Sequence, residues 1–115
     1  MIFGELSLGN YRGRLDIIAD ILQVASQNAK KTQIMYQANL SYKVLQKYLK
    51  ETLDSSLICY ADEERCYIVT EKGREFLDAY QRYTKTSKRA EEHLNDVANK
   101  KNMLEALCSQ KGQCV

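Results

Sequence analysis

Between residues 14 and 55, apolar positions recur with helical period in three successive segments. Arg14 to Ala25 predicts a first helix whose apolar face is Leu15, Ile18, Ile21, Leu22 and Ala25. A shorter helix is expected from Thr32 to Gln37 or Ala38, with Thr32 as its N-cap and with Ile34, Met35 and Ala38 pointing inward. Asn39 suits the turn that follows, because asparagine tolerates left-handed backbone dihedrals.

The third segment, Tyr42 to about Ser55, separates its two faces most clearly, and Ser41 is a good N-cap for it. Its expected buried stripe is Leu45, Tyr48, Leu49 and Leu53. Its opposite face is Lys43, Gln46, Lys47 and Lys50. From Lys30 to Lys50 the chain carries five lysines and no acid. This pattern is typical of a helix-turn-helix whose second helix meets DNA.

Two short runs rich in β-branched and aromatic residues follow, Leu57 to Tyr60 and Cys66 to Thr70. They flank the polar loop from Ala61 to Arg65, so they predict a β-hairpin. A hairpin in this place after a helix-turn-helix is called a wing.

Thr70 is expected to cap a last helix that runs from Glu71 to about Leu107, which is ~55 Å long at 1.5 Å per residue. Its first turns, with Phe76, Leu77 and Tyr80, should pack on the preceding domain. Beyond them, steps of four and three residues mark a coiled-coil seam. The seam is Tyr83, Ser87, Ala90, Leu94, Val97, Lys101, Leu104 and Cys108. The alternative is a single solvated helix, which is marginal in water.

The expected fold is therefore mainly α with a small β-hairpin: a winged helix-turn-helix followed by a long C-terminal coiled-coil helix. Residues 1–12 form an N-terminal extension, and the sequence does not decide between a strand and a loose arm. Residues 13–80 form the winged domain, 81–108 the dimerisation helix and 109–115 a flexible tail.

Composition changes this interpretation only through the distribution of charge. The 115-residue chain has a net charge of only +2 and no proline. Residues 30–50 carry +5, whereas residues 51–64 carry −5, which indicates a directed basic surface. No apolar run approaches ~20 residues and no signal peptide is evident, so we expect a cytoplasmic, nucleoid-associated protein with no membrane partner.

The residue types of the chain do not indicate a metal site or a catalytic site. The spacings of Cys59, Cys66, Cys108 and Cys114 match no common zinc motif, and the sequence does not decide whether these cysteines form disulfides. With one histidine, no glycine-rich phosphate loop and no catalytic triad, we expect no enzyme, no metal, no cofactor and no small-molecule substrate.

The candidate DNA-binding residues lie on the expected second and third helices and on the wing. They are Lys30, Lys31, Thr32, Gln33, Ser41, Tyr42, Lys43, Gln46, Lys47, Lys50 and Arg65. Lysines would meet phosphates or guanine, and Gln46 would meet adenine. The simpler alternative is an ordinary solvated face. For Tyr42 the alternative is packing, and Arg12 and Arg14 either touch DNA or cap the first helix.

Three segments of the chain resemble one known family: residues 14–22, residues 30–50 and residues 67–77. They are similar to archaeal winged-helix DNA-binding proteins of the ten-kilodalton Sulfolobus chromatin-associated type. This resemblance implies DNA binding, as a transcriptional regulator or a chromatin protein. It also implies a homodimer whose C-terminal helices pair antiparallel, with a DNA-binding head at each end. The polar seam residues Ser87 and Lys101 also suggest that polar positions set the register. The sequence does not separate a cellular from a viral origin, and it does not give the DNA site.

A winged helix can instead be a protein–protein interaction module that does not bind DNA. The wing loop favours this alternative, since Asp62, Glu63 and Glu64 flank Arg65 and acids are unfavourable beside phosphate.

Overall fold

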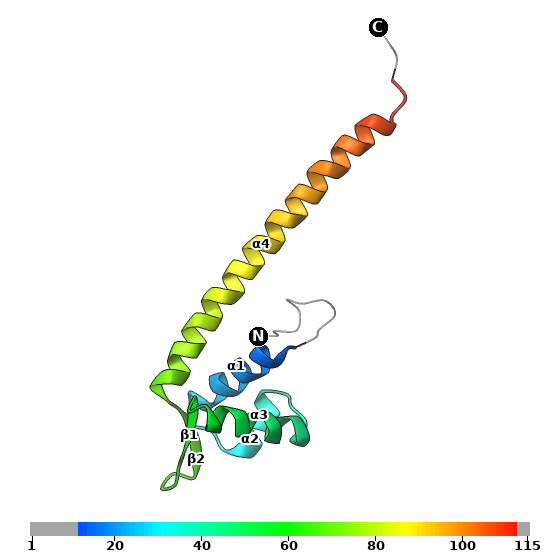
Figure 1. Cartoon of the computed structure of the whole chain (residues 1–115). Helices are drawn as coiled ribbons and strands as arrows, with labels where there is room; N and C mark the ends of the chain where they lie inside the picture. The colour runs from blue at the N-terminus through cyan, green and yellow to red at the C-terminus, as the bar shows by residue number, and fades with distance from the viewer. Residues whose placement is uncertain (1–11, 113–115) are drawn as a thin grey trace. The chain divides into compact units, whose positions relative to one another are not determined.

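The computed structural model describes residues 12–112, which divide after Gln81 into two compact units. The first unit contains three helices, a two-stranded hairpin and the start of α4, and the second contains the rest of that helix (Figure 1). The predicted fold class is confirmed: the chain is mainly helical, with a hairpin and a long C-terminal helix after the winged region. The expectation for the N-terminal extension lies outside the described residues, except at Arg12.

The first helix, α1 (Arg14–Ala25), has the predicted bounds. Ile18, Ile21, Leu22 and Ala25 are buried, as expected. The prediction for Leu15 was wrong, because this side chain, in the first turn of the helix, is 44% exposed. Asp20 is also buried, which the apolar pattern did not predict. A buried carboxylate needs a partner, and here the partner is Arg12, eight residues earlier in the chain.

The second helix, α2 (Lys31–Gln37), begins one residue before the expected start, and its N-cap is Lys30 rather than Thr32. The predicted Thr32 cap was therefore wrong: Thr32 lies inside the first turn. Asn39 has the expected positive φ, 53°, which allows the amide of Leu40 to bond back to the Met35 carbonyl at 3.0 Å. This hydrogen bond closes the turn between α2 and α3.

The third helix, α3 (Tyr42–Asp54), is capped by Ser41, whose hydroxyl accepts a hydrogen bond from the Val44 amide at 3.2 Å. Leu45 and Leu49 are buried as predicted, whereas Tyr48 and Leu53 are only half-buried. Thr52, which the apolar pattern did not indicate, is fully buried, and its hydroxyl donates a hydrogen bond to the Leu49 carbonyl at 2.9 Å. A threonine can occupy a core position because its own helix offers this acceptor.

The wing consists of β1 (Ile58–Ala61) and β2 (Cys66–Val69), which pair antiparallel with Ile58 opposite Val69. A bridge from Ala29 to Tyr67 joins the hairpin to the segment before α2, with amide–carbonyl distances of 3.1 and 2.7 Å. The wing is thereby fixed to the basic end of α2.

The last helix, α4 (Glu71–Ser109), has 39 residues and ends slightly beyond the expected position. Thr70 caps it as predicted, since its hydroxyl accepts from the Gly73 amide at 3.0 Å. Phe76 and Leu77 pack against the core and Tyr80 is buried, as expected. Tyr80 also donates a hydrogen bond to Asp16, which fixes the start of α4 to α1.

Candidate nucleic-acid interface

The exposed face of α3 carries the predicted set Lys43, Gln46, Lys47 and Lys50, all of them exposed. The core beneath α3 holds this face outward, because Leu45 and Leu49 on the opposite side are buried at 0% and 4% exposure. The helix therefore cannot rotate without exposing those leucines. The burial of one side of α3 is what fixes the direction of its lysines.

The side chains on this face differ in how free they are. Lys50 Nζ pairs with the Asp54 carboxylate at 3.2 Å, and Lys47 Nζ lies 5.2 Å from the Tyr48 ring centre. Gln46 donates to the Tyr42 hydroxyl at 2.8 Å. Within residues 12–112, Lys43 has neither an ion pair nor a ring partner. Lys43 and Lys47 are thus the cations with no acid bound to them, and Asp54 partly neutralises Lys50.

The N-terminal end of α2 adds a second group of basic and polar residues. Lys30, Thr32 and Gln33 are exposed, and Lys31 is half-buried. The Lys31 ammonium lies 4.9 Å from the ring centre of Tyr42, so this cation–π contact links α2 to the start of α3. Tyr42 therefore contacts both Lys31 and Gln46, and its ring remains 57% exposed.

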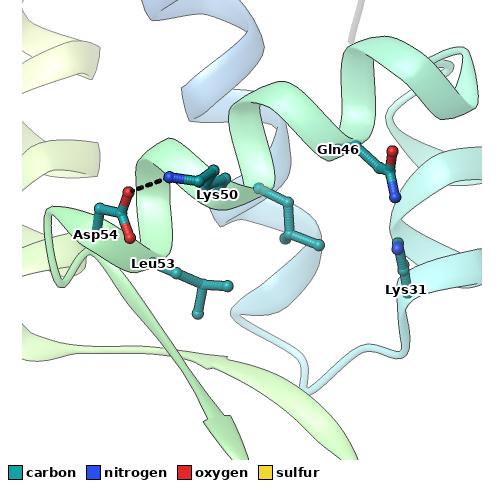
Figure 2. A pocket seen from close by; sticks show the side chains of 6 residues that line it. Lys31, Gln46, Lys50, Leu53 and Asp54 are labelled. Carbon is teal, nitrogen blue, oxygen red and sulfur yellow. Dashed lines mark hydrogen bonds and ion pairs between the residues drawn. The ribbon is translucent and has the colours of Figure 1, made fainter.

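One open hollow separates the tail of Lys31 from the C-terminal half of α3 (Figure 2). It is lined by Lys31, Gln46, Leu49, Lys50, Leu53 and Asp54. In Figure 2 the Gln46 and Lys31 side chains extend toward one another from α3 and α2, while Lys50 turns away toward Asp54. The polar rim and leucine floor make this hollow a surface of contact rather than an enclosed ligand site.

A second hollow lies between the N-terminal end of α2 and the wing. It is lined by Lys30, Lys31, Thr32, Tyr60, Arg65 and Tyr67. The structure thus brings the predicted wing residue Arg65 next to the predicted residues of α2, although about 30 residues of sequence separate them. Tyr60 and Tyr67 were not among the residues predicted for this surface. They are cross-strand partners whose rings meet edge to face at 5.0 Å, and equal strand lengths about the loop could have revealed that pairing.

The wing loop is acidic on its exposed side. Asp62, Glu63 and Glu64 are all exposed, and Arg65 follows them with a positive φ of 53°. The loop therefore presents three carboxylates and one guanidinium within four residues.

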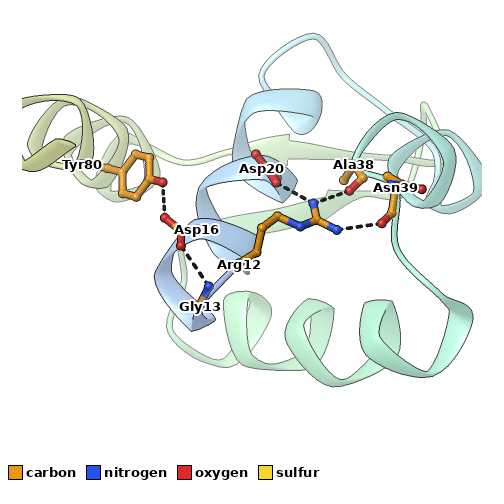
Figure 3. A network of polar contacts seen from close by, with 7 residues as sticks. All are labelled: Arg12, Gly13, Asp16, Asp20, Ala38, Asn39 and Tyr80. Atoms are coloured by element: carbon orange, nitrogen blue, oxygen red, sulfur yellow. Dashed lines mark hydrogen bonds and ion pairs between the residues drawn. The ribbon is translucent and has the colours of Figure 1, made fainter. Parts of the chain in front are cut away.

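Arg12 and Arg14 do not extend the basic face, because both are bound within the domain. The Arg12 guanidinium donates to Asp20 at 2.8 Å and to the carbonyls of Ala38 and Asn39 at 2.7 Å each (Figure 3). Burial raises the pKa of the Asp20 carboxyl, and the hydrogen bond from Arg12 opposes this rise. Arg14 pairs with Glu51 on α3. Arg12 thus fixes the turn that sets α3 against α2.

The predicted seam lies in the second unit, and all eight of its residues are exposed. The larger apolar members keep much of their surface: Tyr83 is 59% exposed, Leu94 69%, Val97 62% and Leu104 65%. An apolar stripe of this length that stays open in one chain is typical of a helix that pairs with another.

Within residues 12–112, Cys59, Cys66 and Cys108 are free thiols. In the same part of the chain, no three His, Cys, Asp or Glu side chains come together as metal ligands do. No helix there combines the length and apolar character needed to cross a membrane.

A family model described as winged helix-turn-helix matches residues 11–88, which include every described element of the first unit. The chain belongs to the winged helix-turn-helix family. The match extends past Gln81 into the second unit and, together with the Sulfolobus structure described next, confirms the resemblance drawn from the sequence.

Two relatives of this winged helix-turn-helix protein come from archaea. Sso10a-2, a DNA-binding protein from Sulfolobus solfataricus, has a similar crystal structure, with a TM-score of 0.70 and 26% identity over 76% of this chain and 95% of that one. An uncharacterized protein of Methanocaldococcus jannaschii is 38% identical over 68 residues, which are 58% of this chain and 31% of the relative. The match thus spans about a third of the length of that relative.

Proposed function

We propose that this winged helix-turn-helix protein binds double-stranded DNA, with α3 in the major groove, as a transcriptional regulator or a chromatin-associated protein. The proposal rests on one observation: α3 buries one face in the core, and lysines and a glutamine lie on its other face. Lysine reaches phosphates and the acceptors of guanine, and glutamine can bind adenine through two hydrogen bonds. The likeness to Sso10a-2, which is itself described as a DNA-binding protein, supports this function.

The groups that flank α3 suit the sugar–phosphate backbone. Lys30, Lys31, Thr32 and Gln33 lie together at the end of α2, and Arg65 lines the same hollow as three of them. We assign these residues to phosphate contacts that orient α3, because such contacts position a protein on DNA without reading its sequence.

The second unit supports a homodimer that forms through the seam. The seam residues form four pairs whose residue numbers have the same sum, which is the condition for facing each other in one antiparallel register. The pairs are Tyr83 with Cys108, Ser87 with Leu104, Ala90 with Lys101, and Leu94 with Val97. An antiparallel pair of identical helices can therefore match every seam residue in one register. In this register Lys101 lies over the small Ala90 of the partner chain, where its ammonium can reach water.

A parallel pair would place the two Lys101 side chains against each other in the core, and like charges at such a position are unfavourable. Shifting one helix of the antiparallel pair along the other by one heptad is also unfavourable, because like charges then meet across the interface. A shift in one direction brings the two Lys100 side chains together, and a shift in the other direction brings the two Glu91 side chains together. The charges of α4 thus favour one arrangement, and it is antiparallel.

The DNA-binding proposal is tested by a Lys43→Ala/Lys47→Ala variant, with fluorescence anisotropy on a labelled duplex over a range of salt. Binding should weaken, and the slope of log K against log salt should flatten by about 0.9 for each phosphate that the variant no longer neutralises. Lys100→Ala/Lys111→Ala is the matched control, since it removes the same charge from exposed positions of the second unit. If the two double variants bind alike at every salt concentration, α3 is not the DNA surface.

The acidic wing supports a second candidate function, a protein–protein interaction module. The same salt titration separates the two candidates. Affinity for DNA should fall steeply with salt, whereas affinity at an apolar protein interface should not.

The dimer is tested with the chain's own Cys108, in a Cys59→Ser/Cys114→Ser background. Under mild oxidation a parallel pair would form a Cys108–Cys108 disulfide between chains, because the two residues would share a layer. An antiparallel pair should instead form a disulfide dimer only after Tyr83→Cys is added. Sedimentation of the unoxidised chain should give a dimer, and a monomer at tens of micromolar would rule out this architecture.

A further inference from the structure

The first turns of the second unit carry an unbroken basic segment that the α3 surface does not include. From Ala79 to Ala90 the chain has four cations and no acid. The cations are Arg82, Lys85, Lys88 and Arg89, and all four are exposed. We call this set the α4 patch.

The four side chains share one face of the helix. At ~100° per residue, Lys88, Lys85, Arg89 and Arg82 fall within an arc of about 120°. The seam residues Tyr83, Ser87 and Ala90 lie on the opposite side, roughly 170° away from the centre of that arc. Pairing through the seam would therefore leave the α4 patch open to a further partner.

No acid of the described chain forms an ion pair with the α4 patch, although Asp78 and Glu92 lie on the same face of the helix. Across residues 12–112 the ion pairs engage only Arg12, Arg14, Lys50 and Lys100, and the last of these lies further along the same helix. Glu91 and Glu92 follow directly but form no ion pair with the four cations. Like charges three and four residues apart weaken a helix by a few tenths of a kcal/mol for each pair, or ~0.2–0.5. Lys85 has cations and no acid at these spacings, so an anionic partner would relieve the repulsion at its ammonium.

We propose that the α4 patch is a second phosphate-binding surface for double-stranded DNA, which extends contact beyond the winged domain. This inference rests on the proposed function. The spacing suits a polyanion, because the patch covers about 10 Å of helix axis and B-DNA presents one phosphate per ~1.7 Å. Lysine and arginine both bind phosphate oxygens, and contacts to phosphates alone are independent of sequence.

An anionic membrane is the other partner that a basic helix could meet, but it would need the apolar face of the same helix. The proposed dimer occupies that face with the seam. Duplex DNA requires only the charges and is therefore the partner to which this surface is assigned.

The test is an Arg82→Gln/Lys85→Gln/Lys88→Gln/Arg89→Gln variant of the full chain, titrated with salt on a random-sequence duplex. Glutamine is a good helix former, so the variant should stay helical and dimeric, which circular dichroism and sedimentation check. We expect the salt slope to fall by about two to four, at about 0.9 for each phosphate that is no longer neutralised. If the fourfold variant unfolds, Lys85→Gln/Arg89→Gln tests the same point, with about half the change.

Net charge needs its own control, because four neutralised cations also make the chain more acidic. Adding Glu71→Gln, Glu75→Gln, Glu91→Gln and Glu105→Gln restores the charge while keeping Asp78 and Glu92, the acids that lie on the face of the patch. If the slope stays low in this variant, the contact is local. If the slope returns to the parent value, only net charge mattered and the proposal is overturned.

The remaining outcomes separate this inference from the proposed function. A folded fourfold variant with the parent slope overturns the α4 patch, while a loss of binding in Lys43→Ala/Lys47→Ala keeps α3 as the DNA surface. If instead only the patch variant loses binding, the patch is supported and α3 fails. Binding of phosphatidylserine vesicles by the parent, with no change in the DNA slope of the fourfold variant, overturns the proposal in favour of a membrane surface.

Discussion

The winged domain and the second half of α4 both carry apolar stripes at helical spacing, but only the domain buries its stripe. Ile21, Leu22 and Ile34 are completely buried. From Arg82 to Gly112, every described side chain except that of the half-buried Thr84 is exposed. The spacing of apolar residues shows which face of a helix is apolar. It does not show whether that face is covered by the same chain or by another one.

The difference has a thermodynamic consequence. Contacts inside the domain form within one molecule, so its stability should not depend on concentration. An isolated helix is marginal in water, so the second unit should depend on a partner chain and hence on protein concentration.

The largest effect is expected from truncating the core. Leu45→Ala should lower the free energy of unfolding by about 2–5 kcal/mol, because it leaves a cavity under α3. Leu94→Ala removes the same atoms from an exposed side chain, so it should weaken dimerisation and leave the unfolding of the winged domain nearly unchanged. Chemical denaturation and sedimentation of both variants separate the two effects. Equal decreases in domain stability would mean that the two units do not differ in this way.

Substitution by alanine, a strong helix former, should have smaller effects on stability, and these effects should have opposite signs in the two units. At Gly73 a Cβ would meet the Leu57 carbonyl and the Val69 side chain, so Gly73→Ala should destabilise the domain by about 1–3 kcal/mol. Asn99→Ala, on the exposed part of α4, should raise helix stability by about 0.5 kcal/mol instead. Thermal melts followed by circular dichroism at one concentration test both signs. Stabilisation by Gly73→Ala would show that the hairpin can move away.

Most of the fold was predictable from sequence because local signals agreed with the tertiary structure. Ser41 and Thr70 cap the helices for which they were predicted, and Asn39 adopts the left-handed conformation expected in the turn. The two buried polar residues that were missed have a common physical origin. Asp20 and Thr52 are buried because of partners that periodicity does not encode, the distant Arg12 in one case and a backbone carbonyl in the other.

The candidate interface was predictable in its residue types but not in its assembly. The lysines of α3 follow from the buried stripe behind them. That Arg65 and the end of α2 line one hollow depends on the pairing of Ala29 with Tyr67, which the sequence does not reveal. Arg12 had two open interpretations, and its three hydrogen bonds place it in the support of the turn.

Within the winged domain, a similar contrast separates the basic α3 from the acidic wing. Replacing Asp62, Glu63 and Glu64 with serine should tighten DNA binding by up to ~10-fold, most at low salt, where repulsion is least screened. Anisotropy at low and high salt measures this change. Glu71→Ser/Glu75→Ser/Asp78→Ser on α4 is the matched control, as it removes the same charge elsewhere. If the two triple variants tighten binding equally, the wing does not face the duplex.

The smallest effect concerns Asp20, whose pKa is raised by burial against the opposing hydrogen bond from Arg12. An acid with a raised pKa holds its proton more tightly in the folded state, so its contribution to stability is complete below the ordinary aspartate pKa of ~3.9. That contribution is lost as the pH rises through the raised value. The free energy of unfolding of the parent should therefore fall, relative to that of Asp20→Asn, as the pH rises from about 4 toward neutrality. Urea denaturation at several pH values measures the difference, with Asp96→Asn, an exposed aspartate of the second unit, as the control. A difference that grows with pH would mean that the ion pair with Arg12 outweighs the cost of burial, and that charge rather than desolvation dominates at the turn between α2 and α3.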